Sequence, residues 1–350
     1  MRPIRVLESF ARIRPTTNPY IVQLAHELDA DPACELMLFS FRRAIAGGYE
    51  VFHVHWPEVI FTGHSRLKTV VRELLTAMIL VRIQLTRQAV VRTQHNLEPP
   101  SDLNWRQRAL LAWFARLTTS TIRLNSLTQG SEGTPVTTIP HGHYRDWFAA
   151  HPHEIPIPGR IAYFGLIRRY KGVESLIEAF RGTKSEGLTL SISGNPSNSE
   201  IRADVDRLAR TDDRIRVDFR FLSDAELVTA VTSAELVVLP YRFMHNSGAT
   251  LTALSLNRPV LVPDTPVNRM LAAEVGRGWL HFYSGELSSK DIDGTVADLR
   301  ARPPDGDAPD LTARSWDHAG EAHIYVFTAA LDRPRRNRRS AVDLDSGAQE

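Results

Sequence analysis

The sequence contains one cysteine in 350 residues and no long uninterrupted apolar run. A single thiol, Cys34, can form neither an internal disulfide nor a cysteine metal cluster, so we expect a reducing compartment. The most apolar long stretch, residues 67–91, is broken by Lys68, Arg72 and Glu73 among other charges. No window reaches the roughly 18 apolar residues that a membrane span requires, and the start of the chain lacks the apolar segment of a secretory signal. We therefore predict a cytoplasmic protein that does not cross a membrane.

The chain also has no marked excess of positive or negative charge. The chain has 42 basic and 40 acidic residues, a formal net charge of +2, which argues against a dedicated nucleic-acid binder. Basic residues do recur within the apolar segments 66–92 and 105–118, and basic amphipathic helices bind anionic lipid surfaces. A solvated helix face packed on its own sheet explains the same pattern and is favoured. Peripheral contact with the inner face of the cell membrane stays open as the second interpretation.

Strand-like and helix-like segments alternate along nearly the whole chain. We expect strands at 4–7, 34–40, 50–56, 89–93, 160–164, 188–193, 215–219, 236–240 and 259–262. We expect helices at 20–29, 67–85, 105–118, 173–181, 200–210, 224–233, 249–256 and 316–331. Strands joined by such helices pair in parallel through right-handed crossovers. Since 350 residues exceed a single core, we predict an α/β fold of two Rossmann-like, doubly wound domains with a ligand at the carboxyl ends of the strands.

A proline-rich segment between His151 and Gly159 marks the predicted domain boundary, because its three prolines suit a linker. We assign residues 1–150 to a first domain, 151–159 to the linker and 160–312 to a second domain. From residue 333 the composition turns to arginine and then to polar and acidic residues. We expect that tail, 333–350, to be disordered.

The segment Tyr163–Phe180 joins a predicted strand to a predicted helix through a glycine turn and a short basic loop. Gly165 lets the backbone approach a bound group, and Arg168 and Lys171 can reach the same point. Two cations near a helix start suit a diphosphate, through charge-assisted hydrogen bonds. On residue types alone, an exposed basic loop without a ligand explains the segment equally well.

This segment resembles the donor-site motif of family-four-like glycosyltransferases of the GT-B fold, Phe-x-Gly-x-x-x-x-x-Lys-Gly-x-x-x-Leu. The resemblance covers nearly the whole chain and is much stronger in the second half. It implies two Rossmann-like domains facing across a cleft, a helix at 313–332 that crosses back to the first domain, and a nucleotide-diphosphate sugar held by Arg168 and Lys171. The His-Trp-Pro corner at 55–57 and the Thr-x-His-Asn corner at 93–96 look closest to bacterial GDP-mannose:glycolipid 4-β-mannosyltransferases. A GDP-sugar is therefore the favoured donor, and no cofactor is expected.

Two further segments resemble donor-binding parts of that family. Gly194, after the strand-like segment 190–193, matches the glycine that borders the nucleotide base, although a simple turn glycine fits as well. Asn246, Ser247 and Gly248 precede a predicted helix, whose free backbone N–H groups can meet an anion while Ser247 caps it. The family normally bears two glutamates here, seven residues apart, and neither is evident. Their absence leaves both retention and inversion of the sugar's configuration open.

In the first half, His95 resembles the histidine found near the transferred sugar and acceptor in many of these enzymes. Imidazole there can act as a base or as a hydrogen-bond donor. If the reaction inverts, His95 and Glu58 are the candidate bases, with Glu98 a weaker one. The acceptor-side candidates are Thr17, Asn18, His55 and Asn96. For a lone histidine, a satisfied polar side chain at a strand end is the competing interpretation.

Histidine pairs also raise the question of a metal. His53 and His55 share one face of a predicted strand, which suits zinc. No carboxylate or cysteine stands at a matching spacing in the sequence. We therefore predict no metal site.

The sequence thus predicts a glycosyltransferase that moves a sugar, with mannose favoured, to a glycan or lipid-linked acceptor in glycolipid or exopolysaccharide synthesis. Its expected partners are the nucleotide-sugar donor and that acceptor, without nucleic acid. Two alternatives stay open. A non-catalytic nucleotide-sugar-binding or scaffold protein of the same fold would account for the missing glutamates. A nucleotide-sugar epimerase would need a carboxylate set near the sugar in the second domain.

Overall fold

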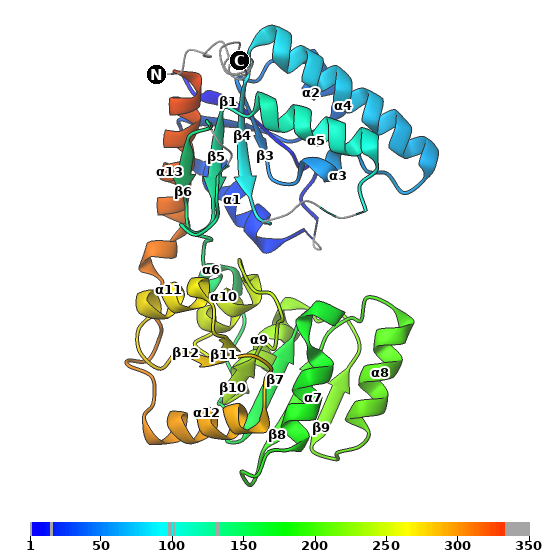
Figure 1. Cartoon of the computed structure of the whole chain (residues 1–350). Helices are drawn as coiled ribbons and strands as arrows, with labels where there is room; N and C mark the ends of the chain where they lie inside the picture. Colours follow the sequence, from blue (N-terminus) through cyan, green and yellow to red (C-terminus); the bar gives the residue numbers. More distant parts are fainter. Residues whose placement is uncertain (1, 15–16, 97–99, 101, 131–132, 333–350) are drawn as a thin grey trace, which may run out of the picture. The chain divides into compact units, whose positions relative to one another are not determined.

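The computed structural model describes residues 2–14, 17–96, 100, 102–130 and 133–332. The chain divides into two compact units, one formed by residues up to Ile139 with the chain from Ala319 onward, the other by Pro140–His318 (Figure 1). Residues 140–150, which we assigned to the first domain, therefore belong to the second unit. The predicted linker also runs along that unit, where the Ile157 N–H donates to the Ser233 carbonyl at 2.9 Å. The predicted tail, 333–350, lies outside the described residues.

The first unit is built on a six-stranded parallel sheet with the order β2-β1-β3-β4-β5-β6 (Figure 1). Its strands are β1 (Ile4–Glu8), β2 (Cys34–Met37), β3 (Val51–Val54), β4 (Ala89–Gln94), β5 (Ser120–Arg123) and β6 (Val136–Thr138). Its helices are α1 (Pro19–Ala30), α2 (Phe41–Ala46), α3 (Pro57–Phe61), α4 (Arg66–Thr86) and α5 (Trp105–Leu117). The central strand β3 is buried along its whole length and β1 over its last three residues, as expected for strands covered by helices on both faces.

A last helix, α13 (Trp316–Leu331), begins in the second unit and belongs to the first from Ala319 onward. Within the first unit it contributes His323 and Phe327, both fully buried. Their ring centroids lie 5.4 Å and 5.2 Å from that of His53 on β3. Helix α13 therefore packs against the middle of the first sheet.

The second unit contains a six-stranded parallel sheet with the order β12-β11-β10-β7-β8-β9 (Figure 1). Its strands are β7 (Arg160–Phe164), β8 (Thr189–Ser193), β9 (Ile215–Asp218), β10 (Leu236–Val238), β11 (Val260–Pro263) and β12 (Leu280–Tyr283). Its α-helices are α6 (Arg145–Phe148), α7 (Val173–Arg181), α8 (Ser199–Ala209), α9 (Asp224–Thr232), α10 (Gly248–Ser255), α11 (Pro266–Val275) and α12 (Ser289–Ala301). Short 3₁₀ turns occur at η1 (Arg169–Lys171) and η2 (Thr312–Arg314). The predicted α/β fold of two doubly wound domains is confirmed.

Helix starts follow the capping residues of the sequence. The side chains of Ser65, Asn104 and Ser223 accept hydrogen bonds from backbone N–H groups in the first turns of α4, α5 and α9. Each such cap satisfies donors that a helix start otherwise leaves unpaired. Among the helices that the structure describes, none is both long and apolar enough to span a membrane.

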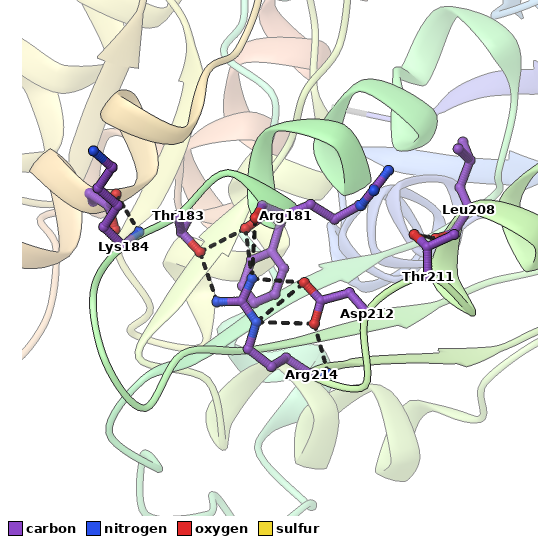
Figure 2. Close-up of polar contacts among 9 residues, drawn as sticks. Arg181, Thr183, Lys184, Leu208, Thr211, Asp212 and Arg214 are labelled. Carbon is purple, nitrogen blue, oxygen red and sulfur yellow. Dashed lines mark hydrogen bonds and ion pairs between the residues drawn. The ribbon is translucent and has the colours of Figure 1, made fainter.

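Arg214 joins the start of β9 to the end of α7 (Figure 2). Its guanidinium donates to the Asp212 carboxylate at 2.7 Å and to the Thr183 hydroxyl at 3.1 Å. It also lies 4.8 Å from the centroid of the Phe180 ring. Because an arginine presents several donors in a fixed plane, this one side chain holds the sheet's edge strand against a helix.

Candidate active site

In the second unit, two predicted donor-site glycines lie side by side at the carboxyl ends of neighbouring strands. The Gly165 N–H donates to the Ser193 carbonyl at 3.0 Å, one residue before Gly194. A Cβ atom added to Gly194 would lie 1.8 Å from the carbonyl oxygen of Gly165, and Gly165 itself has φ +107°. Both positions therefore require glycine, one for space and one for backbone conformation.

The two arginines of the basic loop after β7 differ in their ion-pair partners. Arg169 pairs with the carboxylates of Glu174, Glu200 and Asp204 at 2.8–3.0 Å. Arg168, by contrast, is exposed and forms no ion pair with any residue that the structure describes. Its charge acts on the neighbouring Lys171, whose pKa falls to about 8, first through burial and then through that repulsion. Neither Arg168 nor Lys171 forms an ion pair with a carboxylate of the described residues, and cations of this kind suit an anion.

The loop that follows β10 covers this basic loop. The Nζ atom of Lys171 lies 4.8 Å from the centroid of the Tyr241 ring, and the Arg242 N–H donates to the Tyr170 carbonyl at 2.9 Å. Gly172 begins α7 with φ +66°, and a Cβ there would meet the Pro240 carbonyl oxygen at 2.2 Å. The buried hydroxyl of Tyr241 has no hydrogen-bond partner among the described residues, as expected beside a site that a polar ligand completes.

Farther along the same loop, Ser247 begins α10. Its hydroxyl accepts a hydrogen bond from the Thr250 N–H at 3.1 Å, so the predicted cap is present. Asn246 and Gly248 flank it, and the hydroxyl of Tyr144 would be 3.3 Å from a Cβ on Gly248. In this unit the structure thus places Gly165, Lys171 and Gly194 around the ends of β7 and β8, and the Asn246–Gly248 segment at the start of α10.

In the first unit, a buried polar cluster lies at the carboxyl edge of the sheet. Glu8 ends β1 and stands opposite His53 in the register of β1 and β3. The His53 Nδ1 atom is 2.7 Å from Glu8 Oε1, and its Nε2 atom is 2.8 Å from the Thr93 hydroxyl. Glu8, His53 and Thr93 are each fully buried. Buried polar groups persist only when paired in this way.

His55 connects this cluster to His95. The His55 Nε2 atom lies 3.3 Å from Glu8 Oε2, while its Nδ1 atom lies 3.0 Å from His95 Nε2. The Trp56 ring stacks on the His95 ring at 4.1 Å, and the Tyr20 ring meets it edge-on at 5.1 Å. The imidazole of His95 is thus oriented by packing as well as by hydrogen bonding.

Burial and pairing set the charges of this cluster. Burial raises the pKa of Glu8, but the charge and hydrogen bonds of His53 and His55 outweigh it and bring the pKa to about 2. The pKa of His55 falls to about 4, chiefly because burial disfavours its charged form. Near neutral pH, a carboxylate anion therefore sits beside a neutral His55.

The other predicted first-half residues have structural partners of their own. Thr17 and Asn18 hold the loop before α1, accepting hydrogen bonds from the Arg14 and Tyr20 N–H groups at 2.8 Å and 3.0 Å. Glu58 lies half-buried in the first turn of α3, where its charge acts on Arg92. Asn96 is exposed directly after His95. Glu98 lies outside the described residues.

The carboxylate of Glu8 could not be recognised as a possible metal ligand from its spacing in the sequence. We found no carboxylate at a metal-ligand spacing from His53 and His55, but the sheet brings Glu8 to them, and one ligand atom from each lies within 4.8 Å of the others. The donor set suits zinc in type. The fit is poor in detail, because His53 uses both ring nitrogens in hydrogen bonds, one of them to Glu8.

The outer face of α4 is apolar and exposed. Leu67 is 75%, Leu74 62% and Leu85 78% exposed. Apart from the adjacent pair Val70 and Val71, the exposed apolar residues of this helix recur every three or four positions. They comprise Leu67, Val70, Val71, Leu74, Met78, Val81 and Leu85. We call this set the α4 face. Soluble surfaces seldom align so many apolar side chains.

Comparison with known proteins identifies the class. The profile described as "Glycosyl transferases group 1" matches residues 158–283. The chain is 43% identical over 330 residues to a GDP-mannose:glycolipid 4-beta-D-mannosyltransferase of Xanthomonas campestris pv. campestris, covering 94% of this chain and 93% of that protein. The chain therefore belongs to the family of these glycosyltransferases and is itself a glycosyltransferase. The resemblance identified from the donor motif is confirmed.

Solved structures share the fold. AviGT4, a glycosyltransferase involved in avilamycin A biosynthesis, aligns with a TM-score of 0.58 at 14% identity over 94% of this chain and 98% of that one. A UDP-GlcNAc 2-epimerase from Neisseria meningitidis aligns with a TM-score of 0.56 at 13% identity, over 93% and 100%. The fold therefore accommodates both transferases and epimerases. It is the relationship at 43% identity that favours transfer over the epimerase and scaffold alternatives.

Proposed function

We propose that this enzyme transfers mannose from GDP-mannose to a lipid-linked glycan. The observation that supports it best is the pair Arg168 and Lys171, adjacent cations without a carboxylate partner among the described residues. A nucleoside diphosphate leaving group gains negative charge as the bond to the sugar breaks. Cations that already lie beside the leaving diphosphate lower the activation barrier of sugar transfer. The relative's name supplies GDP-mannose and the glycolipid.

In this proposal the donor is held by the second unit. Gly165 and Gly194 allow the ends of β7 and β8 to approach each other closely, at the edge where doubly wound sheets bind nucleotides. The N-terminus of α7 carries no side-chain cap, and the N–H groups of α10 begin beside Asn246 and Gly248. Such helix starts favour phosphate oxygens.

The first unit contributes the base. His95 would accept the proton of the acceptor hydroxyl as its oxygen forms the new bond to the anomeric carbon, while the diphosphate leaves with the electrons of the old bond. Glu58 is the second candidate, through its half-buried position on α3. Thr17, Asn18, His55 and Asn96 remain acceptor-side proposals. No metal is required in this scheme, because Arg168 and Lys171 supply the positive charge.

Titration calorimetry of the full chain with GDP, UDP and ADP tests the donor site. We expect GDP to bind most tightly, and Arg168→Ala with Lys171→Ala to weaken binding by at least tenfold, about 1.4 kcal/mol. Lys184→Ala, an exposed lysine of the same unit (Figure 2), is the matched control. GDP binding that survives the double substitution unchanged would refute the donor-site assignment.

We further propose that the enzyme works at the cytoplasmic surface of a membrane, docked through the α4 face. Exposed cations border this face at Arg66, Lys68 and Arg87. Trp105, 75% exposed, lies at the start of α5, which packs beside α4 (Figure 1). An apolar face bordered by positive charge matches an anionic bilayer. An open groove of about 660 Å³ lies at the start of α4, lined by Arg66 and by Arg106 among others, with Arg106 paired to Glu73.

Sedimentation with liposomes tests this docking. We expect binding to vesicles of phosphatidylcholine with phosphatidylglycerol, weak binding to phosphatidylcholine alone, and release at high salt. Leu74→Glu with Met78→Glu should abolish binding, whereas Phe221→Glu, at an exposed phenylalanine of the second unit, should leave it unchanged. Equal binding by the α4 variant and the wild type would contradict the proposal.

A further inference from the structure

Three polar groups of the first unit form a continuous line that ends at His95. Glu8 Oε2 lies at an ion-pair distance of 3.3 Å from His55 Nε2, without the alignment of a hydrogen bond, and His55 Nδ1 lies 3.0 Å from His95 Nε2. Glu8 is 0% and His55 2% exposed, so water does not compete for these contacts. A line of this kind, held in a low-dielectric interior, couples its members strongly.

The negative charge of Glu8 determines which ring nitrogens of the neighbouring histidines carry a proton. A carboxylate only accepts hydrogen bonds, so Glu8 favours a proton on its partner His53 Nδ1. Its negative charge, 3.3 Å from His55 Nε2, favours a second proton there. His55, neutral, then presents an unprotonated Nδ1 atom. The His95 Nε2 atom, 3.0 Å away, must donate to it. His95 is thereby protonated at Nε2 and unprotonated at Nδ1.

We propose that Glu8 and His55 are positioning residues that fix the tautomer of His95 and stabilise the imidazolium it becomes. This rests on the proposed function, in which His95 is the base. When His95 Nδ1 takes the acceptor's proton, the ring carries a proton on each nitrogen and one positive charge. Its Nε2–H bond to His55 becomes charge-assisted and shorter. The Glu8 carboxylate, which lies on the far side of the His55 ring, offsets the new positive charge on His95.

Packing supports this assignment over a purely structural one. Trp56 stacks on His95 at an interplanar angle of 22°, which fixes the plane of the His95 ring. The Ser9 hydroxyl, next to Glu8, accepts the His55 backbone N–H at 3.1 Å and holds that residue in place. A cluster whose sole role was to fill the core would need neither the buried anion nor the connection to a partly exposed histidine.

Glu8→Gln is the sharpest test, because a glutamine amide can accept from His53 and donate to His55 Nε2. His55 would then carry its proton on Nδ1 and donate to His95, which reverses the tautomer of His95. We expect kcat for mannose transfer from GDP-mannose to alkyl glycosides to fall about 10²-fold or more, with the KM for GDP-mannose unchanged. His55→Phe should lower kcat similarly.

Nitrogen NMR of ¹⁵N-histidine-labelled full-length protein provides a readout that needs no acceptor. We expect the Nε2–H tautomer of His95 in the wild type and the Nδ1–H tautomer in Glu8→Gln. His26→Gln, at an exposed histidine of α1, is the control and should change neither the tautomer of His95 nor kcat by more than about threefold.

The outcomes separate the two proposals. If His95→Gln keeps wild-type kcat, His95 is not the base and the proposed function fails at that step. If His95→Gln is inactive but Glu8→Gln and His55→Phe retain kcat, the positioning role alone is refuted. The same refutation follows if His95 has the Nδ1–H tautomer in the wild type, or keeps its tautomer in Glu8→Gln.

Discussion

The ammonium group of Lys171 lies over the ring of Tyr241, 4.8 Å from its centroid. The contact links the basic loop after β7 to the loop after β10, two segments 70 positions apart in the sequence. An aromatic face attracts a cation without neutralising it. Lys171 is therefore held in place with its charge still available to a diphosphate.

The pH dependence of donor binding should report on this lysine. Burial, followed by the charge of Arg168, lowers the pKa of Lys171 to about 8. Below that pH the side chain is charged and attracts the diphosphate; above it the charge is lost. The GDP dissociation constant should rise toward tenfold per pH unit above the pKa, measured by calorimetry from pH 7 to pH 9. Lys171→Arg, which stays charged throughout, should show a flat profile; an unchanged slope would assign the titration to another group.

The start of α10 should serve both stability and donor binding. Ser247→Ala removes the hydrogen bond from the Thr250 N–H and should cost about 1 kcal/mol of unfolding free energy. Asn198→Ala removes the equivalent cap of α8, a 2.9 Å bond from the Ile201 N–H, at a similar cost. Only Ser247→Ala should also weaken GDP binding in calorimetry. Equal GDP affinities in the two variants would remove Ser247 from the donor site.

The first unit should lose stability as the pH falls below the ordinary histidine value of 6.5. Burial lowers the pKa of His323 to about 3 and that of His55 to about 4, so the unfolded chain binds protons that the folded chain refuses. Each contributes up to about 1.4 kcal/mol of lost stability per pH unit. Glu8 does not add to this loss above pH 4.5, since its lowered pKa acts only between 4.5 and about 2.

His323→Phe isolates one of these groups, because the ring lies among Phe327 and His53. Between pH 7 and pH 5, urea unfolding of this variant should show about 1–2 kcal/mol less destabilisation than the wild type. His26→Gln, at an exposed histidine of α1, should behave like the wild type. A His323→Phe profile that parallels the wild type would show that His323 is protonated in the folded protein.

Local patterns predicted most of the fold. Segment 173–181 was expected as a helix and is one, because its apolar residues repeat at helical spacing and pack on the sheet. The strand order could not be predicted, since it depends on pairing between distant segments. The strand β6 (Val136–Thr138) was missed because it has three half-exposed or exposed residues and shows no apolar alternation.

In the candidate site, too, local patterns could be predicted and pairing between distant segments could not. Arg168 and Lys171 could be predicted because one short loop carries both. Glu8 was missed, since it is brought to His53 only by the register of β1 with β3, across 45 positions of sequence. One signal was present: β1 reads Ile-Arg-Val-Leu-Glu, and an acidic residue that ends a buried strand needs a partner.

Two glycines of the second unit differ in the space around them. A Cβ at position 194 would lie 1.8 Å from the Gly165 carbonyl oxygen, whereas one at position 294, on α12, would meet no atom within 4 Å. Gly194→Ala must push the ends of β7 and β8 apart, and it should lower the unfolding free energy by about 1–3 kcal/mol and weaken GDP binding. Gly294→Ala should raise the unfolding free energy by about 0.5–1 kcal/mol and leave GDP binding alone. Urea unfolding and calorimetry on both variants measure the two effects. Full GDP affinity in Gly194→Ala would mean that the approach of these two strand ends does not shape the donor site.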